Sequence, residues 1–131
     1  MNAWADHDGD GDLDLFVGFN GTPNRLYRND AGRLTEVAAE AGVADARATR
    51  AAAWGDADAD GDPDLLVGFA PGAGSVLRLY RNDPSPDGSG QARRFTDVSA
   101  AAGIHSPEVA FGLGIAVSDV NRDGWPDVYV S

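Results

Sequence analysis

The chain has 131 residues, with 21 acidic against 10 basic residues, so its formal net charge is −11 and 43% of its residues are hydrophobic. All ten basic residues are arginine and cysteine is absent, which excludes a disulfide scaffold, a zinc–thiolate site and a cysteine nucleophile. The acidic balance argues against binding to nucleic acid phosphates or to an anionic membrane surface, and no apolar stretch is long enough to span a membrane.

The acidic residues are concentrated in three nine-residue windows, at positions 6–14, 56–64 and 119–127. The windows hold 13 of the 21 acids and one of the ten arginines, so the rest of the chain, with 8 acids and 9 arginines, is nearly neutral. Five carboxylates within nine residues repel one another strongly at contact distances. A fold that gathers them needs a cation, or it must point them into solvent.

In chain order, the first unit begins with a short segment around Trp4, before the first window. The apolar run Leu15–Val17 follows the window, and the alternating segment Arg25–Arg28 and the segment Leu34–Val37 come next. This pattern predicts four short strands, although little sequence precedes the window to form the first one. We expect the alanine-rich stretch Glu36–Arg50 to be a turn and a connector rather than a helix, because it lacks large apolar residues at helical spacing.

The second unit repeats the first from Trp54 onward, and a third unit repeats its first half. The strands expected in the second unit are Leu65–Val67, Arg78–Arg81 and Phe95–Val98, with a flexible hairpin loop at 84–90. The third unit offers a strand before its window, at 114–118, and the apolar run Val128–Val130 after it. The three apolar runs that follow the windows are typical of buried strands.

The period of the repeat is 50 residues from Asp6 to Asp56 and 63 residues from Asp56 to Asp119, with the extra residues between the matched segments. Four short strands in each repeat of this length are typical of a propeller blade. The sequence therefore predicts an all-β fold of about two and a half antiparallel blades. We expect the first blade at about 1–45, the second at about 46–108 and half of a third at about 109–131.

Each window follows the pattern Asp-x-Asp/Asn-x-Asp-Gly-x-x-Asp, which is typical of a calcium loop. Side-chain oxygens at positions 1, 3 and 5 converge when the chain wraps around a point, and glycine at position 6 permits the sharp turn. Calcium takes six to eight oxygen ligands of this kind, whereas magnesium prefers few protein ligands. The predicted ligands are Asp6, Asp8, Asp10, Asp12 and Asp14; Asp56, Asp58, Asp60, Asp62 and Asp64; and Asp119, Asn121, Asp123, Trp125 and Asp127, with Asp12, Asp62 and Trp125 binding through the backbone carbonyl.

An EF-hand is excluded by the position of the last ligand. An EF-hand loop needs an acidic residue at position 12, and here that position is Val17, Val67 or Val130. The last ligand comes at position 9 instead, so each loop closes early and continues directly into a strand. We expect up to three calcium ions in the chain. The third site should bind most weakly, because Asn121 supplies an oxygen but no charge.

The combined pattern resembles the FG-GAP/VCBS repeat of integrin-α-like β-propellers. The motif Trp-Ala/Gly-Asp-x-Asp-x-Asp-Gly-x-x-Asp-Leu-x-Val-Gly, followed by Leu-Tyr-Arg-Asn and Leu/Phe-Thr-Glu/Asp-Val, carries the resemblance. The segment Phe111–Gly114 resembles the element that gives the repeat its name. The resemblance implies one calcium loop between the first two strands of each blade, and it implies closed rings of about six to eight blades.

The sequence leaves three candidate functions for this chain. The first is a non-catalytic, calcium-stabilised propeller module for structure or recognition. The second is a glycan-binding, lectin-like propeller in which Trp4, Trp54 or Trp125 stacks on a sugar, although packing roles are the simpler interpretation for Trp4 and Trp54. The third, a metal-dependent hydrolase, has little support, because His7 and His105 lack a nucleophile at a recognisable spacing and are expected to be solvated. We therefore predict that the protein is not an enzyme.

The repeat also makes predictions about assembly and cellular setting. Two and a half blades cannot close a ring. The chain is then a fragment of a longer propeller, a natural or designed subunit that closes a ring by self-assembly, or a subunit whose third-unit strands complete a blade of another copy. Of these we expect homo-oligomerisation into a closed propeller, with a protein or glycan as a further possible ligand. The N-terminus has no basic segment followed by an apolar run, so no signal peptide is expected in this chain. The family resemblance and the calcium loops predict an extracellular, cell-surface or periplasmic setting for the parent protein.

The arginines Arg28 and Arg81 are expected to pair with acids on neighbouring strands.

Overall fold

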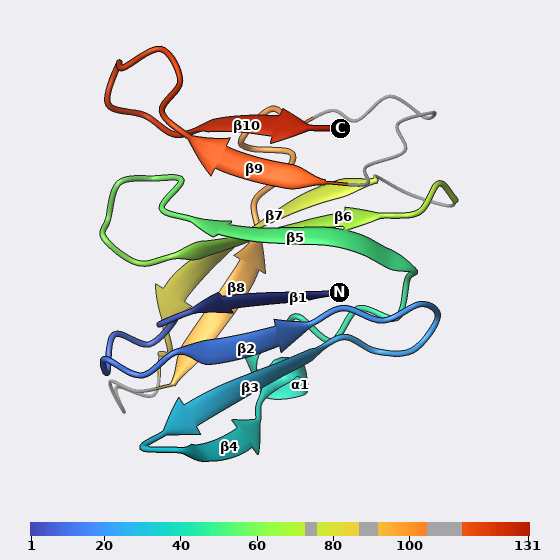
Figure 1. Cartoon of the computed structure of the whole chain (residues 1–131), viewed down its shortest axis with the longest axis vertical. Coiled ribbons are helices and arrows are strands. Elements are labelled where there is room, and N and C mark those ends of the chain that lie inside the picture. The colour runs from blue at the N-terminus through green and yellow to red at the C-terminus, as the bar shows by residue number, and fades with distance from the viewer. Residues whose placement is uncertain (73–75, 87–91, 105–113) are drawn as a thin grey trace.

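The computed structural model describes residues 1–72, 76–86, 92–104 and 114–131. In these residues the chain forms two four-stranded antiparallel sheets and one two-stranded sheet, each with its strands in chain order. Figure 1 shows the sheets stacked as successive layers, with β1, β5 and β9 side by side along the stack. Stacked four-stranded meanders of this kind are propeller blades, so the predicted all-β fold of antiparallel blades is confirmed.

The first blade consists of β1 (Asn2–Ala5), β2 (Asp14–Val17), β3 (Arg25–Asp30) and β4 (Arg33–Glu36). Strand β1 is present despite the short sequence before the window, and it pairs with β2 from Asn2↔Val17 to Ala5↔Asp14. The alanine-rich stretch that follows contains a single helical turn, α1 (Ala38–Ala41), within the expected connector. The turn ends at Gly42, whose φ of 88° is the left-handed conformation that caps a helix.

The second blade consists of β5 (Thr49–Gly55), β6 (Asp64–Phe69), β7 (Leu77–Pro84) and β8 (Arg93–Asp97). Every residue of β6 is buried, as its continuous apolar sequence predicts. The predicted hairpin loop at 84–90 lies mostly outside the described residues.

The third sheet consists of β9 (Ile115–Ser118) and β10 (Asp127–Val130), which pair from Asp127↔Ser118 to Val130↔Ile115. The prediction of a buried strand at Val128–Val130 is wrong for this sheet, since Tyr129 is 67% exposed and its two neighbours are also exposed. Strand β10 has β9 as its one partner among the described strands, so its far edge is unpaired in the described part of the chain. The predicted family element at 111–114 lies outside the described residues except for Gly114.

The main core lies between the first two blades. Phe16 and Leu26 of the first blade meet the apolar face of the second, and α1 closes the layer with two buried alanines. The buried residues of this cluster are Phe16, Leu26, Ala38, Ala41, Val43, Leu65, Val67, Phe69, Tyr80 and Phe95. Because both sheets contribute, burial of this core fixes the two blades against each other.

The equivalent tryptophans have different surroundings. The Trp54 ring lies 6.4 Å from the His7 ring and 5.9 Å from the Phe95 ring, between the first and second blades, which confirms a packing role. Trp4 occupies the same position in the first blade and is 52% exposed, because no blade covers that face in the described chain. Trp125, inside the third window, is also exposed.

Arg28 and Arg81 form ion pairs within their own strands. Arg28 binds Asp30 at 3.1 Å and Arg81 binds Asp83 at 2.8 Å, two residues further along β3 and β7. The expectation of partners on neighbouring strands is therefore wrong for both. Residues two apart in a strand lie on the same face, which makes this local pairing possible.

Among the described residues, no helix has the length and apolar character needed to cross a membrane.

Candidate metal centres

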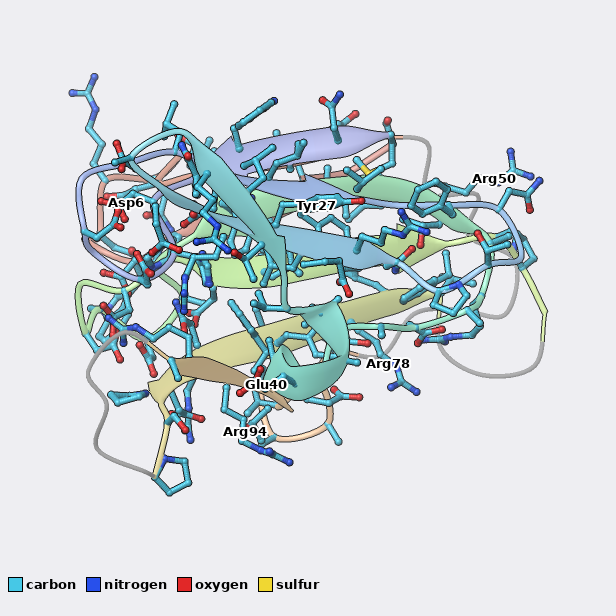
Figure 2. All side chains as sticks on the ribbon, turned by 90° about the horizontal axis from the view of Figure 1, so that it is seen from below. Asp6, Tyr27, Glu40, Arg50, Arg78 and Arg94 are labelled. Atoms are coloured by element: carbon cyan, nitrogen blue, oxygen red, sulfur yellow. The ribbon has the colours of Figure 1, made fainter. Side chains whose placement is uncertain are left out.

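The three acidic windows are the loops that join the first two strands of the three sheets. Figure 1 shows them on the same side of the stack, at the left of the view, and in Figure 2 Asp6 lies at the end of the molecule opposite Arg50. The strand pairings place positions 1 and 9 of each window at the mouth of a hairpin. The repeat therefore brings all three windows to one edge of the molecule.

All three loops share one backbone conformation. The glycines at position 6, Gly11, Gly61 and Gly124, have φ values of 95°, 95° and 90°, which confirms the predicted sharp turn. Position 4 is also left-handed, at Gly9 with φ 77°, Ala59 with φ 61° and Arg122 with φ 63°. A left-handed alanine and arginine are uncommon, so the loop must hold these residues against their own preference.

Carboxylates within each loop hold this conformation by accepting backbone N–H groups. In the first loop, Asp6 accepts the Asp10 N–H at 3.1 Å and the Gly11 N–H at 2.9 Å. Asp56 and Asp119 accept the matching N–H groups of their own loops at 3.0–3.1 Å. Position 5 accepts the N–H of position 7 in every loop, at 2.8–2.9 Å. The windows are thus organised loops rather than solvated acidic segments.

In the first two windows, the aspartate at position 9 links the loop to the sheet. Asp14 accepts the His7 N–H on one oxygen and the Asn29 N–H of β3 on the other, both at 2.8 Å. Asp64 makes the same two bonds with Ala57 and with Asn82 of β7, also at 2.8 Å. Both carboxylates are therefore fixed by their own blade.

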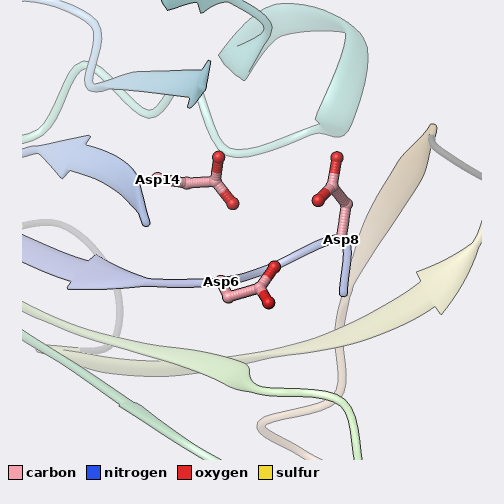
Figure 3. A group of neighbouring side chains, drawn as sticks. All are labelled: Asp6, Asp8 and Asp14. Atoms are coloured by element: carbon pink, nitrogen blue, oxygen red, sulfur yellow. The ribbon is translucent and has the colours of Figure 1, made fainter. Parts of the chain in front are cut away.

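Two of the windows bring three carboxylates together. Asp6, Asp8 and Asp14 offer oxygens that all lie within 4.8 Å of one another, and so do Asp56, Asp58 and Asp64. Figure 3 shows the first group, with its three side chains gathered around one space between the loop and β2. These residues are positions 1, 3 and 9 of the predicted ligand sets. A third group of this kind is absent among the described acidic and histidine side chains of window 119–127.

The other predicted ligands have different surroundings. The Asp12 side chain accepts the Ala31 N–H at 2.7 Å, and the Asp62 side chain pairs with Arg93 of β8 at 2.5 Å. Those two side chains stabilise the blade, and binding through their carbonyls stays a prediction. In the third window, Asn121 donates to Asp123 at 2.9 Å, so the amide relieves repulsion there by hydrogen bonding.

One carboxylate of the first site, that of Asp8, has a buried oxygen without a hydrogen-bond donor. Asp8 is 7% exposed, and its Oδ2 has no hydrogen-bond partner among the described residues. Burial and the nearby Asp14 charge raise the pKa of Asp8. A buried carboxylate oxygen without a donor is costly, and a cation between Asp6, Asp8 and Asp14 would compensate it. The donor set, all hard oxygens, suits calcium.

The surroundings shift the pKa values of the three buried carboxylates, those of Asp8, Asp14 and Asp64, in different directions. Burial opposes ionisation of Asp14, but hydrogen bonds from His7 and Asn29 outweigh it and lower the pKa of Asp14. Burial raises the pKa of Asp64, and the charges of Asp58 and Asp60 act in the same direction. In the first site the surroundings therefore favour the charged form of Asp14 and disfavour that of Asp8, and in the second site they disfavour the charged form of Asp64.

The prediction that His7 is solvated is wrong. Its side chain is 2% exposed, its Nδ1 lies 2.5 Å from Asp14 Oδ2, and its ring stacks on Phe95 at 6.0 Å. The loop sequence gave no sign of this, because the covering residue belongs to the next blade. His105 lies outside the described residues.

Sequence reasoning also missed the roles of Asn82 and Arg93. The Asn82 amide donates to the Pro63 carbonyl at 3.1 Å and to the His7 carbonyl at 2.8 Å. The signal in the sequence was that an asparagine follows Leu-Tyr-Arg in both blades. Arg93 interacts with Asp62 through two nitrogens and ties β8 to the second loop. No repeated motif marks Arg93, since the first blade has no matching pair.

These features define a tandem array of two four-stranded blades and a two-stranded sheet, each with an organised acidic loop between its first two strands. Comparison with protein families gives the same result: residues 6–67 match the model of the FG-GAP-like repeat. That range runs from the first window into β6, so the resemblance of the sequence to the FG-GAP-like repeat is confirmed over these residues. A search of curated proteins finds no match.

Proposed function

We propose that this chain is a non-catalytic, calcium-binding β-propeller module for structure or recognition. The observation that carries the proposal is the buried, unpartnered Oδ2 of Asp8, a residue whose carboxylate clusters with those of Asp6 and Asp14. The second window repeats the same three positions with Asp56, Asp58 and Asp64. Acidic clusters of hard oxygens favour calcium over softer metals.

Calcium would act here as a structural ion. When bound, it supplies positive charge that offsets repulsion among carboxylates held within one loop. Aspartate side chains at positions 1 and 9 already fix the loop by accepting N–H groups, so little reorganisation is needed for binding. FG-GAP-like repeats are typically structural modules, which agrees with a role that involves no catalysis.

Self-association is part of the proposal. The first blade exposes Trp4 on the face whose equivalent in the second blade, with Trp54 and Leu65, is covered by its neighbour. The third sheet exposes Tyr129 at the other end of the stack. Stacking the end of one copy on the start of the next would cover both faces, and repetition of that contact closes a ring.

The cellular setting follows from the expected affinity of the loops. Extracellular calcium modules work at about 10⁻⁴ to 10⁻³ M calcium, and exposed acidic loops of this kind fit that range. We therefore propose an extracellular, cell-surface or periplasmic setting for the parent protein. The glycan ligand considered from the sequence stays a prediction.

The test of calcium binding is thermal unfolding in excess calcium, in chelator and in magnesium at equal ionic strength. A site filled at 100 times its Kd stabilises the fold by about 2.7 kcal/mol, so two sites should raise the melting temperature by several degrees or more. Magnesium should give a much smaller rise. An unchanged melting temperature between calcium and chelator would reject the proposal.

A further inference from the structure

The side chain of Asn82 forms a bridge between the first and second acidic loops. Its Nδ2 donates to the carbonyl of His7, at position 2 of the first loop, at 2.8 Å. The same nitrogen donates to the carbonyl of Pro63, at position 8 of the second loop, at 3.1 Å. Asn82 is fully buried, and its Oδ1 has no hydrogen-bond partner among the described residues. The two donated bonds therefore determine where the amide lies.

The backbone of the same residue contacts a predicted metal ligand. The Asn82 N–H donates to Asp64 Oδ1 at 2.8 Å, and Asp64 is one of the three clustered carboxylates of the second loop. On the other side of the bridge, the His7 N–H donates to Asp14, which is one of the three in the first loop. A continuous set of hydrogen bonds thus runs from Asp14 through His7 and Asn82 to Asp64.

The equivalent residue of the first blade lacks the bridge. The Asn29 amide donates to the Leu13 carbonyl, at position 8 of its own loop, at 3.1 Å, and its backbone N–H donates to Asp14. These two bonds match those of Asn82 within its own blade. The bond to His7 is the additional one, and it joins residues 75 positions apart.

Ring packing reinforces the contact at the His7 end. The His7 ring stacks on Phe95 of β8 at 6.0 Å and lies 6.4 Å from the Trp54 ring of β5. A shift of the first loop would therefore disturb two strands of the second blade. Packed side chains of this kind have few alternative positions, so the two loops cannot move independently.

We infer that Asn82 couples the two acidic loops, so that a divalent cation in one loop raises the affinity of the other. The inference rests on the proposed calcium binding. An ion in the first loop would restrict the remaining motion of Asp14 and the His7 carbonyl. Through Asn82 it would also restrict the remaining motion of the Pro63 carbonyl and Asp64. The second loop then loses less conformational freedom when it binds its own ion, which is positive cooperativity, and coupling is reciprocal.

The test measures calcium binding by calorimetry in proteins whose third window is disabled by Asp119→Ala. Asp58→Ala disables the second loop and reports the first alone, and Asp8→Ala does the reverse. We expect each loop to bind at least about fivefold more weakly when the other is disabled than when the other is filled. In Asn82→Ala, disabling one loop should leave the Kd of the other unchanged.

Asn29→Ala is the matched control. It removes the equivalent amide within the first blade but leaves the bridge intact, so the dependence between the loops should persist. Asn82→Thr, with circular dichroism and melting data, provides a second variant should the alanine variant fold poorly. A variant that loses the bridge and still shows full dependence between the loops would overturn the role of Asn82.

A measurement that needs no change at Asn82 completes the test. In Asp58→Ala, filling the first loop with calcium should slow amide hydrogen exchange in residues 56–64. Unchanged exchange there, or equal Kd values with and without the other loop, would overturn the coupling while leaving calcium binding in place. Absence of calcium uptake by every loop would reject the proposed function and the coupling together.

Discussion

At the residue scale, the two clustered sites differ at position 3. Asp8 is buried with one unpartnered oxygen, whereas Asp58 is exposed, although the two residues are equivalent in the repeat. The first loop packs against Phe95 and Asn82 of the second blade through His7, the residue next to Asp8. The same sequence motif therefore gives one site with a strong requirement for a cation and one with a weaker requirement.

This difference predicts opposite effects of Asp8→Asn with and without calcium. In chelator the variant should be more stable than the parent at pH 7, because it removes a buried, uncompensated charge. In calcium it should lose part of the stabilisation contributed by the first site, because the amide keeps an oxygen but removes a charge. Melting temperatures in chelator and in excess calcium, compared with those of Asp58→Asn, test the prediction. The control should gain little in chelator, and a destabilised Asp8→Asn in chelator would contradict the argument.

The pH dependence has a definite sign. The pKa of Asp8 is raised above its ordinary value of 3.8, so the metal-free folded protein holds this proton where the unfolded chain releases it. Stability from this group is therefore present at low pH and is lost as the pH rises through the raised pKa. The advantage of Asp8→Asn in chelator should accordingly be absent below about pH 3.8 and should grow above it.

At the element scale, glycines after β2 and within β6 allow the inner strands of successive blades to approach. A Cβ added at Gly18 would lie 2.4 Å from Thr49 Cγ2 and 3.1 Å from Met1 Sδ. At Gly68, the equivalent position in the second blade, the nearest atom would be Ile115 Cδ1 at 3.4 Å. The first pair of blades is therefore packed more tightly at this point than the second and third.

Gly18→Ala should accordingly destabilise the protein more than Gly68→Ala. Overpacking at a rigid contact costs about 1–3 kcal/mol, and we expect Gly18→Ala to fall in that range. Contact at 3.4 Å can be relieved by small movements, so Gly68→Ala should cost less. Denaturant unfolding in calcium measures both free energies of unfolding. Equal losses for the two variants would show that the approach of β5 does not constrain Gly18.

The strands were largely predictable from the sequence, and their burial was less so. The apolar run Leu65–Val67 and the alternating run Arg78–Arg81 became β6 and part of β7, since alternation and apolar content determine how a strand can pack. Val128–Val130 has the same apolar character but forms the exposed β10. Its exposure depends on neighbouring strands, which local sequence does not specify.

At the scale of the whole molecule, the stack presents an exposed apolar face at each end. Trp4 marks the face of the first blade, and Tyr129 marks the face of the third sheet. Within the chain, the equivalent face of the second blade is covered and forms the main core. The interface between the first and second blades is thus a template for contact between copies.

Trp4→Ser should weaken association of the chain in calcium. A half-exposed tryptophan adds little to the stability of a monomer, but a contact that covers it would lose a large aromatic anchor. Light scattering with calcium present should give an oligomeric mass for the parent and a smaller mass for the variant. Trp125→Ser, in an exposed loop, should keep the parent mass. A monomeric parent would reject self-association.

The sequence by itself determined what depends on contacts within a few residues. Glycine at position 6 and aspartates at positions 1, 5 and 9 form the loop through hydrogen bonds that stay within nine residues, so the loop could be predicted from its spacing. The short apolar and alternating runs determined the strands in the same way, because the side-chain period of a strand is local.

The tertiary structure decided what depends on residues far apart in the chain. Burial of His7 and Asp8, the bridge from Asn82 and the pairing of Arg93 with Asp62 all arise where one blade packs on the next or a late strand meets an early loop. Repeated sequence makes each blade look alike, but each blade has different neighbours. The properties that distinguish equivalent residues come from those neighbours, and local sequence therefore could not reveal them.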